Sequence, residues 1–220
     1  MNVRDSARRE RLARELAGKG IANPAVLDAM RAVPRERFVE EALRGEAYND
    51  VALPIGEKQT ISQPWIVARM CELAYGDGRG RVLEIGTGSG YHAAILSYLF
   101  ERVYTVERIA SLSRLARSRL RELGIETVHF KIFDGSYGWS EFAPYEAAVV
   151  TAAVPEIPLP LISQLADGGR LVLPLAEAGQ DYQTLVRLIK RGDDVVREEH
   201  GGCRFVPLVG RFGLLGGETG

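Results

Sequence analysis

Residues 81–91 read RVLEIGTGSGY, and this stretch decides the fold. Arg81 to Ile85 form a short apolar run of strand length, and the residues from Tyr91 onward have helical spacing. The glycines between them let the backbone turn tightly and approach a ligand, while the start of the helix offers free N–H donors. Tyr91 occupies the position where the dinucleotide-binding pattern G-x-G-x-x-G requires its third glycine. The stretch therefore predicts a ligand-binding strand–loop–helix unit of a different kind.

Short apolar runs alternate with helical stretches from residue 80 onward. We expect helices at 91–100, 109–123 and 159–165 between strands at 81–85, 103–106, 128–132, 147–151 and 170–173. Alternation at this spacing implies crossover connections and a parallel sheet. Two longer runs, 183–190 and 195–206, are joined at Gly192-Asp193-Asp194 and predict a hairpin. The expected fold class is α/β, with a doubly wound, mostly parallel sheet and a C-terminal antiparallel hairpin.

The chain before about residue 75 reads as helices and loops. Helices are expected over 6–16 and 25–32, and Asn23-Pro24 gives the second helix an N-cap followed by proline at its first position. A short helix follows Pro34, and a further helix begins near Pro64. Residues 48–62 carry no sustained helical period and are expected to form an ordered loop.

Composition bounds the class of protein. The 220 residues carry 28 Lys+Arg against 29 Asp+Glu, and 46% are hydrophobic, which excludes disorder and argues against bulk electrostatic binding of nucleic acid. The N-terminus lacks the apolar core of a signal peptide, and the most apolar stretch, 147–162, is interrupted by prolines. Cys71 and Cys203 suit a reducing compartment. We expect a soluble, cytoplasmic protein that is monomeric by default, with no membrane or nucleic-acid partner.

Two acidic positions fit a nucleoside ligand. Glu107 ends the second strand of the α/β part, about 20 residues after the glycine loop, where a carboxylate can accept both hydroxyls of a ribose. Asp134-Gly135 follows the third strand, at the same edge of the sheet. Ligands bind beyond the carboxyl ends of parallel strands, so these residues and the loop are expected to border one site. The alternative is a glycine-rich turn with solvated carboxylates.

The pattern G-x-G-x-G after an acidic residue resembles motif I of the class I S-adenosylmethionine-dependent methyltransferases. Further stretches are similar to one family of that class, the protein-L-isoaspartate (D-aspartate) O-methyltransferases. They are MRAVPRERFV (30–39), YND (48–50), LPIG (53–56), QTISQP (59–64), LEIGTGSGY (83–91), VTAA (150–153) with Pro155, QL (164–165), GG (168–169), LV (171–172) and FVPL (205–208). GTGSG alone would indicate only a methyltransferase, whereas TISQP before it and VTAA after it are specific in combination.

The resemblance, which spans about residues 25–213, implies a Rossmann-like methyltransferase fold, S-adenosyl-L-methionine as cofactor, S-adenosyl-L-homocysteine as product and no metal. It implies methyl esterification of the free α-carboxylate of L-isoaspartyl residues in damaged proteins and peptides, which initiates repair through a succinimide. The cofactor-binding residues are then Glu84, Gly86, Thr87, Gly88, Ser89, Gly90, Glu107, Asp134 and Gly135. The substrate-binding residues are Thr60, Ile61, Ser62, Thr151, Ala152 and Ala153, with Ser62 as the catalytic hydroxyl.

We expect one compact domain in three parts. Residues 1–76 form an N-terminal helical extension with the substrate loop, residues 77–213 the methyltransferase core, and residues 214–220 a flexible tail. The chemistry needs no general base, because a carboxylate with a pKa near ~3.5–4 is ionised at neutral pH. The protein's part is to align the reacting atoms and exclude water.

Some local interpretations stay open. Ser62 also suits the N-cap of the helix near Pro64, a role worth ~1 kcal/mol. The small residues Thr151 to Ala153 suit close helix–sheet packing as well as a substrate peptide. Three positions depart from the family pattern, and the first of them could alter peptide preference: Lys58, Phe133 and Glu146.

Two other functions also stay open. A class I methyltransferase acting on nucleic acid or a small molecule would be favoured by a basic face or by Asn/Asp-Pro-Pro-Tyr after the fourth strand, where residues 151–155 read TAAVP. A non-catalytic binding protein with the same fold would be favoured by a damaged glycine loop or by the loss of Glu107 or Ser62. All three features are intact.

Overall fold

Seven strands form the central sheet of this computed structural model, which describes residues 3–76, 79–177 and 180–213. Their order across the sheet is β5-β4-β3-β6-β7-β8-β9. The strands are β3 (Arg81–Ile85), β4 (Arg102–Glu107), β5 (Val128–Ile132), β6 (Tyr145–Val150), β7 (Leu165–Ala176), β8 (Gln183–Arg191) and β9 (Asp194–Cys203).

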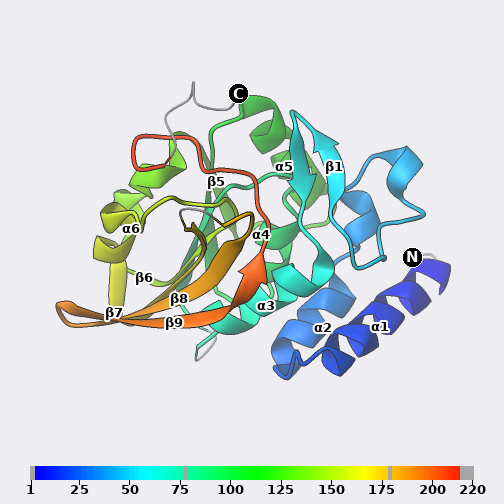
Figure 1. Cartoon of the computed structure of the whole chain (residues 1–220). Helices are drawn as coiled ribbons and strands as arrows, with labels where there is room; N and C mark the ends of the chain where they lie inside the picture. The colour runs from blue at the N-terminus through cyan, green and yellow to red at the C-terminus, as the bar shows by residue number, and fades with distance from the viewer. Residues whose placement is uncertain (1–2, 77–78, 178–179, 214–220) are drawn as a thin grey trace.

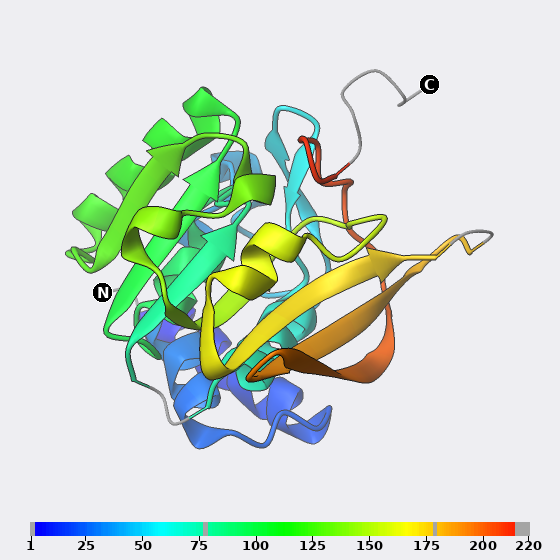
Figure 2. The same ribbon diagram turned by 90° about the vertical axis from the view of Figure 1, so that its left-hand side faces the viewer.

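The pairing confirms the predicted fold class. Strands β3 to β7 are parallel to one another, whereas β8 pairs antiparallel with both β7 and β9. Figure 2 shows the twist of this sheet, with the hairpin of β8 and β9 turned well away from the green strands. The order of the strands reverses beside β3, since β4 and β5 extend to one side and β6 to the other. Such a switch point opens a crevice beyond the carboxyl ends of the strands.

Helices cover both faces of the sheet. The described residues form α1 (Val3–Gly18), α2 (Pro24–Ala32), α3 (Pro64–Ala74), α4 (Tyr91–Leu96), α5 (Ala110–Glu122) and α6 (Leu159–Ser163), with short 3-10 helices η1 (Arg35–Arg37), η2 (Glu41–Leu43), η3 (Gly135–Tyr137) and η4 (Ser140–Phe142). Asn23 caps α2 as predicted, because its Oδ1 accepts from the N–H groups of Ala25 and Val26 at 3.0 and 3.4 Å.

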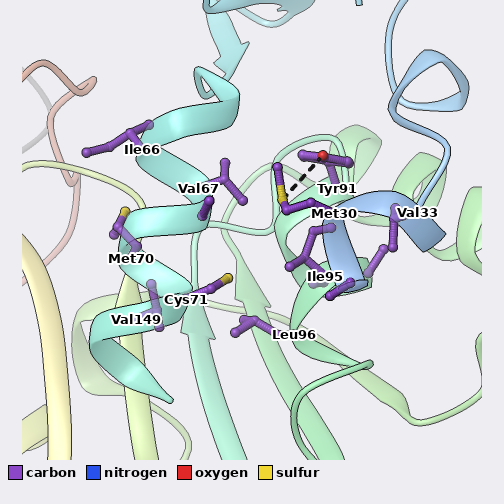
Figure 3. Close-up of a cluster of buried hydrophobic side chains, with 14 of the residues drawn as sticks. Met30, Val33, Ile66, Val67, Met70, Cys71, Tyr91, Ile95, Leu96 and Val149 are labelled. Atoms are coloured by element: carbon purple, nitrogen blue, oxygen red, sulfur yellow. Dashed lines mark hydrogen bonds between the residues drawn. The ribbon is translucent and has the colours of Figure 1, made fainter. Parts of the chain in front are cut away.

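Alternate strand residues contribute to two hydrophobic clusters, one on each face. Val82 belongs to the cluster packed by α1 to α5, whereas its neighbour Leu83 belongs to the cluster that α6 covers. Figure 3 shows part of the first cluster, where Val67 and Cys71 of α3 point toward Met30 of α2. The helices before residue 75 therefore pack on this face of the sheet and form part of its hydrophobic cluster.

The prediction of a loop over residues 48–62 is wrong for the second half of that segment. β1 (Leu53–Gly56) and β2 (Gln59–Ile61) form an antiparallel hairpin, which stands apart from the main sheet (Figure 1). Glu57 and Lys58 join the strands with φ angles of 52° and 56°, the left-handed conformations that a two-residue hairpin turn requires. Neither residue is the glycine, asparagine or aspartate that marks such turns, so the sequence carried no hairpin signal.

Several predicted element ends also differ. Helix α4 ends at Leu96 rather than at 100, because the backbone continues in tighter turns, with the N–H of Leu99 donating to the carbonyl of Leu96. Helix α6 ends at 163 rather than 165, β7 begins at 165 rather than 170, and β9 ends at 203 rather than 206. The short helix expected after Pro34 is a pair of 3-10 turns.

The predicted boundary after residue 76 and the predicted tail at 214–220 fall on residues outside the described ranges, so the division of the chain stays a prediction. Within the described ranges, no helix combines the length and apolar character needed to cross a membrane.

Candidate active site at the carboxyl edge of the sheet

The glycine loop after β3 has a conformation that only glycine adopts readily. Gly86, Gly88 and Gly90 have φ angles of 94°, 51° and 89°. A Cβ atom on Gly86 would lie 2.4 Å from Oγ1 of Thr151, the residue that follows β6. The loop thus passes directly against the end of the neighbouring strand, and its backbone forms one wall of the crevice at the switch point.

Glu107 fixes this loop from the end of β4. Its Oε2 accepts from the N–H of Gly88 at 3.0 Å, and its Oε1 accepts from the N–H of Ile109 at 2.9 Å. The side chain is largely buried, yet it lines the cavity beside the loop. A carboxylate oxygen can accept more than one hydrogen bond, so both oxygens of Glu107 can still accept a hydrogen bond from a ligand. Glu107 thus lies beside the loop at the end of β4, as expected from the sequence, and its contact with a ribose stays a prediction.

The structure brings most of the predicted site residues to the lining of one open cavity. The segment from Gln59 to Ser62 closes it on one side, the glycine loop on another, and residues 206–209 on a third. The predicted residues that line this cavity are Thr60, Ile61, Ser62, Gly86, Thr87, Gly88, Ser89, Glu107, Gly135, Thr151 and Ala152.

Glu84 lies beneath the loop instead of in the cavity. The hydroxyl of Thr105 donates to its Oε2 at 2.5 Å, and the hydroxyls of Thr105 and Thr87 lie 2.6 Å apart. Burial raises the pKa of Glu84 to about 8, with a smaller raising effect from Glu107 and an opposing effect of the Thr105 hydrogen bond. Nδ1 of His92 lies 4.0 Å from Oε1, and burial lowers the pKa of His92 to about 4. These polar groups support the loop from below.

Three further predicted residues stay outside the cavity. Gly90 packs against α5, where a Cβ would lie 2.9 Å from that of Ala116. Asp134 is the N-cap of η3: its Oδ1 accepts from the N–H of Ser136 at 2.9 Å, and its Oδ2 accepts from the N–H of Arg211 at 2.8 Å. Asp134 thereby joins the end of β5 to the C-terminal segment, and its neighbour Gly135 faces the cavity.

Ala153 pairs with the C-terminal segment. Its N–H donates to the carbonyl of Val206, and its carbonyl accepts from the N–H of Leu208, both at 2.8 Å. These bonds occupy its backbone groups, whereas Thr151 and Ala152 line the cavity. The close-packing interpretation therefore describes Ala153 better than direct exposure to a ligand.

Ser62 is not the N-cap of α3. Gln63 occupies the capping position without a side-chain hydrogen bond, and Oδ1 of Asp50 accepts from the N–H of Trp65 at 2.8 Å. Asp50 thus supplies the carboxylate at this helix start, from a segment that sequence spacing does not connect with it. The capping role weighed for Ser62 was wrong, and its side chain lies where the cavity meets a second groove.

This second groove continues from the cavity on the side away from the glycine loop. It shares Thr60, Ser62, Thr151 and Val206 with the cavity and reaches along the end of β9. Sequence reasoning assigned no role to its remaining lining residues, which include Trp65, Tyr182 and Arg204. These residues lie far apart in the sequence, so no local sequence pattern could have indicated that they line one groove. His92, which follows Tyr91 directly, also lines the cavity; the sequence left open whether it forms a wall or lies at the surface.

The three departures from the family pattern lie outside both hollows. Lys58 is in the turn of the β1–β2 hairpin, and the carboxylate of Glu146 accepts from the N–H of Arg81 at 2.6 Å. Phe133 is half exposed, with Nζ of Lys131 4.5 Å from its ring centroid. The described part of the chain contains no group of three or more His, Cys, Asp and Glu residues arranged to hold a metal ion.

Fold and loop together define a Rossmann-like methyltransferase: a mostly parallel sheet with a switch point, a G-x-G-x-G loop after its first parallel strand and an acidic residue at the end of the next. The sequence profile described as "Protein-L-isoaspartate(D-aspartate) O-methyltransferase (PCMT)" matches residues 7–213. The chain belongs to this family.

Individual relatives agree over nearly the full chain. Protein-L-isoaspartate O-methyltransferase 2 of Geotalea uraniireducens (strain Rf4) is 52% identical over 213 residues, covering 96% of this chain and 97% of the relative. A solved protein-L-isoaspartate O-methyltransferase superposes with a TM-score of 0.85 at 32% identity, covering 93% of this chain and 67% of that one. A Plasmodium falciparum structure, described as a candidate member in complex with S-adenosyl-L-homocysteine, has the same fold, with a TM-score of 0.77 at 22% identity and coverage of 91% and 97%.

Proposed function

We propose that this protein is an S-adenosyl-L-methionine-dependent methyltransferase that esterifies the free α-carboxylate of L-isoaspartyl residues in damaged proteins and peptides. The observation that carries the proposal is the meeting of two elements in one cavity: the glycine loop held by Glu107, and the segment from Thr60 to Ser62. The first is suited to a nucleoside, and the second borders a groove that continues away from the glycine loop. Family membership supports the same reaction.

The residues at the end of β4 fit the nucleoside part of the cofactor. Glu107 keeps free lone pairs toward the cavity while its hydrogen bonds to Gly88 and Ile109 hold it in place. The glycines let the loop backbone lie at the cavity, and a Cβ at Gly86 would collide with Oγ1 of Thr151 and displace the loop. When bound, the cofactor supplies a methyl group on a sulfonium. Gly86, Thr87, Gly88, Ser89 and Glu107 are the residues that would hold it, with Glu84 and Gly90 acting from behind the loop.

Asp134 and Gly135 complete the proposed cofactor side. Gly135 lines the cavity, and a Cβ there would lie 2.4 Å from Cγ2 of Ile85, so the backbone is pressed against the end of β3. Asp134 holds this turn by capping it and by tying it to Arg211. We assign Asp134 the role of shaping this wall and Gly135 the direct contact.

The substrate side needs donors more than bases. An α-carboxylate is ionised at neutral pH, so the protein has to desolvate it, orient one oxygen and exclude water. Desolvation is costly unless hydrogen bonds replace those of water. The hydroxyl of Ser62 stands at the junction of cavity and groove and makes no cap, which leaves it free to donate to the carboxylate. Thr60, Ile61, Thr151 and Ala152 would position the peptide around it.

The alternative functions have less support. A nucleic-acid methyltransferase needs a basic face, yet the chain carries 28 basic against 29 acidic residues, and TAAVP replaces a base-flipping motif after β6. A binding protein without catalysis needs no intact Ser62 or Glu107, and both border the cavity. We further propose that the protein acts as a cytoplasmic monomer on isoaspartyl proteins, with no metal, no nucleic-acid partner and no membrane partner.

The test uses two synthetic peptides that differ only in one L-isoaspartyl or one normal aspartyl linkage. Each is incubated with the protein and S-adenosyl-L-methionine, and mass spectrometry measures the gain of one methyl group. We expect methylation of the isoaspartyl peptide alone, suppressed by added S-adenosyl-L-homocysteine. If neither peptide gains a methyl group while calorimetry still detects cofactor binding, the substrate assignment is wrong and another methyl acceptor has to be sought.

A further inference from the structure

Arg35 is a fully buried arginine that the proposed chemistry does not use. It lies in η1, directly after α2, and its side chain has no exposed surface. Its guanidinium donates to three backbone carbonyls from separate parts of the chain: Nε to Ala47 at 2.8 Å, and Nη2 to Ser62 at 2.8 Å and to Val51 at 3.4 Å. One side chain thereby joins the segment before β1 to the residue proposed to bind the substrate carboxylate.

The flat face of the same guanidinium rests on the cofactor half of the site. Its Cζ lies 4.8 Å from the ring centroid of Tyr91, the first residue of α4 after the glycine loop. The Tyr91 ring is itself held by two contacts. Phe38 lies in edge contact with it, at 5.5 Å between ring centroids. The Tyr91 hydroxyl lies 3.8 Å from the sulfur of Met30 (Figure 3). Arg35 therefore lies between the two walls of the cavity, in contact with a residue of each.

An ion pair does not explain an arginine here. Burying a charge is expensive, and an ion pair is the usual compensation. Within the described residues, however, no carboxylate lies within 4.0 Å of the Arg35 guanidinium, and its Nη1 has no hydrogen-bond partner. Burial lowers the pKa of Arg35, yet a guanidinium starts so far above neutral pH that it stays charged. An apolar side chain would avoid that desolvation cost but would leave the carbonyls of Ala47 and Ser62 without these donors, so the role of the arginine lies in those bonds.

The fork-shaped geometry of the guanidinium group explains why the residue is an arginine. A guanidinium is planar and rigid, so donors on two of its nitrogens fix the relative position of the carbonyls they bind. We propose that Arg35 is a positioning residue: it holds the backbone of Ser62 at a set distance from Tyr91 and the glycine loop, so that the methyl acceptor and the methyl donor meet in line. This inference rests on the proposed function, because it assigns Arg35 to the alignment of that reaction. Misplacement by about 1 Å is enough to slow such a transfer by ~10²-fold.

The experiment compares R35M, R35K and R37M. Methionine keeps much of the volume against Tyr91 but has no donor, and lysine keeps the charge but not the fork. Arg37 is the matched control, since it lies in the same turn, half exposed, and donates to Glu122 at 2.9 Å. For each variant we would measure kcat and KM for the isoaspartyl peptide, the Kd for S-adenosyl-L-homocysteine and the Tm, with activity expressed per cofactor-binding molecule.

We expect R35M and R35K to lose at least about tenfold in kcat/KM for the peptide, while the Kd for S-adenosyl-L-homocysteine changes less than about threefold. R37M should keep kinetics within about twofold of the wild type. Kinetics of the wild type in folded R35M and R35K would overturn the proposal and leave Arg35 as a packing residue. Equal losses of cofactor and peptide affinity would also overturn it, because they indicate general damage to the fold.

Hydrogen exchange gives a readout that does not depend on turnover, and its measurement on the wild type needs no variant. In the wild type, residues 47–51 and 59–63 should open with the same free energy, since Arg35 links both segments. In R35K, exchange at 59–63 should accelerate while the glycine loop keeps its protection. Independent opening of the two segments in the wild type would refute the link. If the wild type leaves the isoaspartyl peptide unmodified, the proposed function fails separately, whatever the exchange shows.

Discussion

The two walls of the cavity are built in different ways. The wall proposed to bind the cofactor, here called the cofactor wall, comes from the ends of β3 and β4, where Glu107 holds the glycine loop through its hydrogen bond to Gly88. The substrate wall combines residues 59–62 with residues 206–209, which lie far apart in the sequence. The first wall is a local motif with one supporting strand, whereas the second exists only when the hairpin, Arg35 and the C-terminal segment come together. Damage to each wall should therefore have a different signature.

The largest effect should follow from Gly86→Ala. A Cβ at this position would lie 2.4 Å from Oγ1 of Thr151, and the φ of 94° is unfavourable for any other residue. We expect cofactor affinity to fall more than ~100-fold, or about 2.7 kcal/mol. The control is Gly124→Ala, where φ is 70° but the added Cβ would meet nothing within 4 Å. Calorimetry with S-adenosyl-L-homocysteine measures both affinities, and similar losses would mean that general damage to the fold, and not the collision at Gly86, lowers the affinity.

Glu107→Ala should weaken the same wall by a smaller amount. The change removes the acceptor for the N–H groups of Gly88 and Ile109 together with the proposed ribose contact. Hydrogen bonds to charged groups are worth about 1.5–3 kcal/mol, so we expect a 10- to 100-fold weaker Kd for S-adenosyl-L-homocysteine. Glu101→Ala removes an exposed carboxylate as the control. Unchanged affinity in Glu107→Ala would refute the ribose assignment.

Ser62→Ala should affect only the substrate wall. We expect kcat/KM on the isoaspartyl peptide to fall about tenfold, since one hydrogen bond to a charged group is lost. Cofactor affinity should stay the same, and unfolding stability should change by less than about 0.5 kcal/mol because Ser62 caps no helix. Ser118→Ala, at an exposed hydroxyl on α5, is the control. Full activity in Ser62→Ala would rule out the donor role.

Glu84 makes the stability of the folded protein depend on pH. Its pKa is about 8 in the folded protein against about 4.3 in an unfolded chain, so the folded state holds an extra proton between these values. Stability therefore falls as pH rises through this window. His92 acts in the opposite direction below its ordinary pKa of about 6.5, because burial lowers its pKa to about 4. Between pH 6.5 and 8 the effect of Glu84 is thus unopposed by His92.

The measurement is denaturant unfolding of the wild type and Glu84→Gln across that interval. From pH 6.5 to 8 the wild type should lose about 1–2 kcal/mol relative to the variant, given 1.36 kcal/mol per pH unit for one proton. Glu126→Gln, at an exposed carboxylate, should follow the wild type. Parallel curves for wild type and Glu84→Gln would mean that Glu84 is ionised in the folded protein.

The smallest effect should come from the hairpin turn. Lys58 has a φ of 56°, a conformation that costs a side chain about 1–2 kcal/mol, whereas glycine loses roughly 0.5–1 kcal/mol through its greater freedom when unfolded. Lys58→Gly should therefore stabilise the protein by about 0.5–1 kcal/mol in chemical denaturation. Lys58→Ala keeps the strain and removes the charge, so equal gains in both variants would point to charge instead of backbone strain.

The parallel sheet and the cofactor wall could be predicted from the sequence because their signals are local. The apolar run from Arg81 to Ile85, the glycines after it and Glu107 at the next strand end all read from neighbouring residues. The hairpin at 53–61 was missed because Glu57 and Lys58 adopt left-handed conformations without the residues that usually mark them. The capping of α3 was misjudged because the carboxylate beside its first turn comes from Asp50, outside the helix signal.

By itself the sequence determined the alternation of strands and helices, the glycine loop and the family, since periodicity, glycine placement and motif order are properties of the chain as written. Only the tertiary structure decided that Glu84 lies below the loop, that Asp134 turns away from the cavity, and that Arg35 reaches the carbonyl of Ser62. Those three outcomes depend on burial and on contacts between distant segments. Such contacts form only when the whole sheet and its helices pack together, and no short stretch of sequence encodes them.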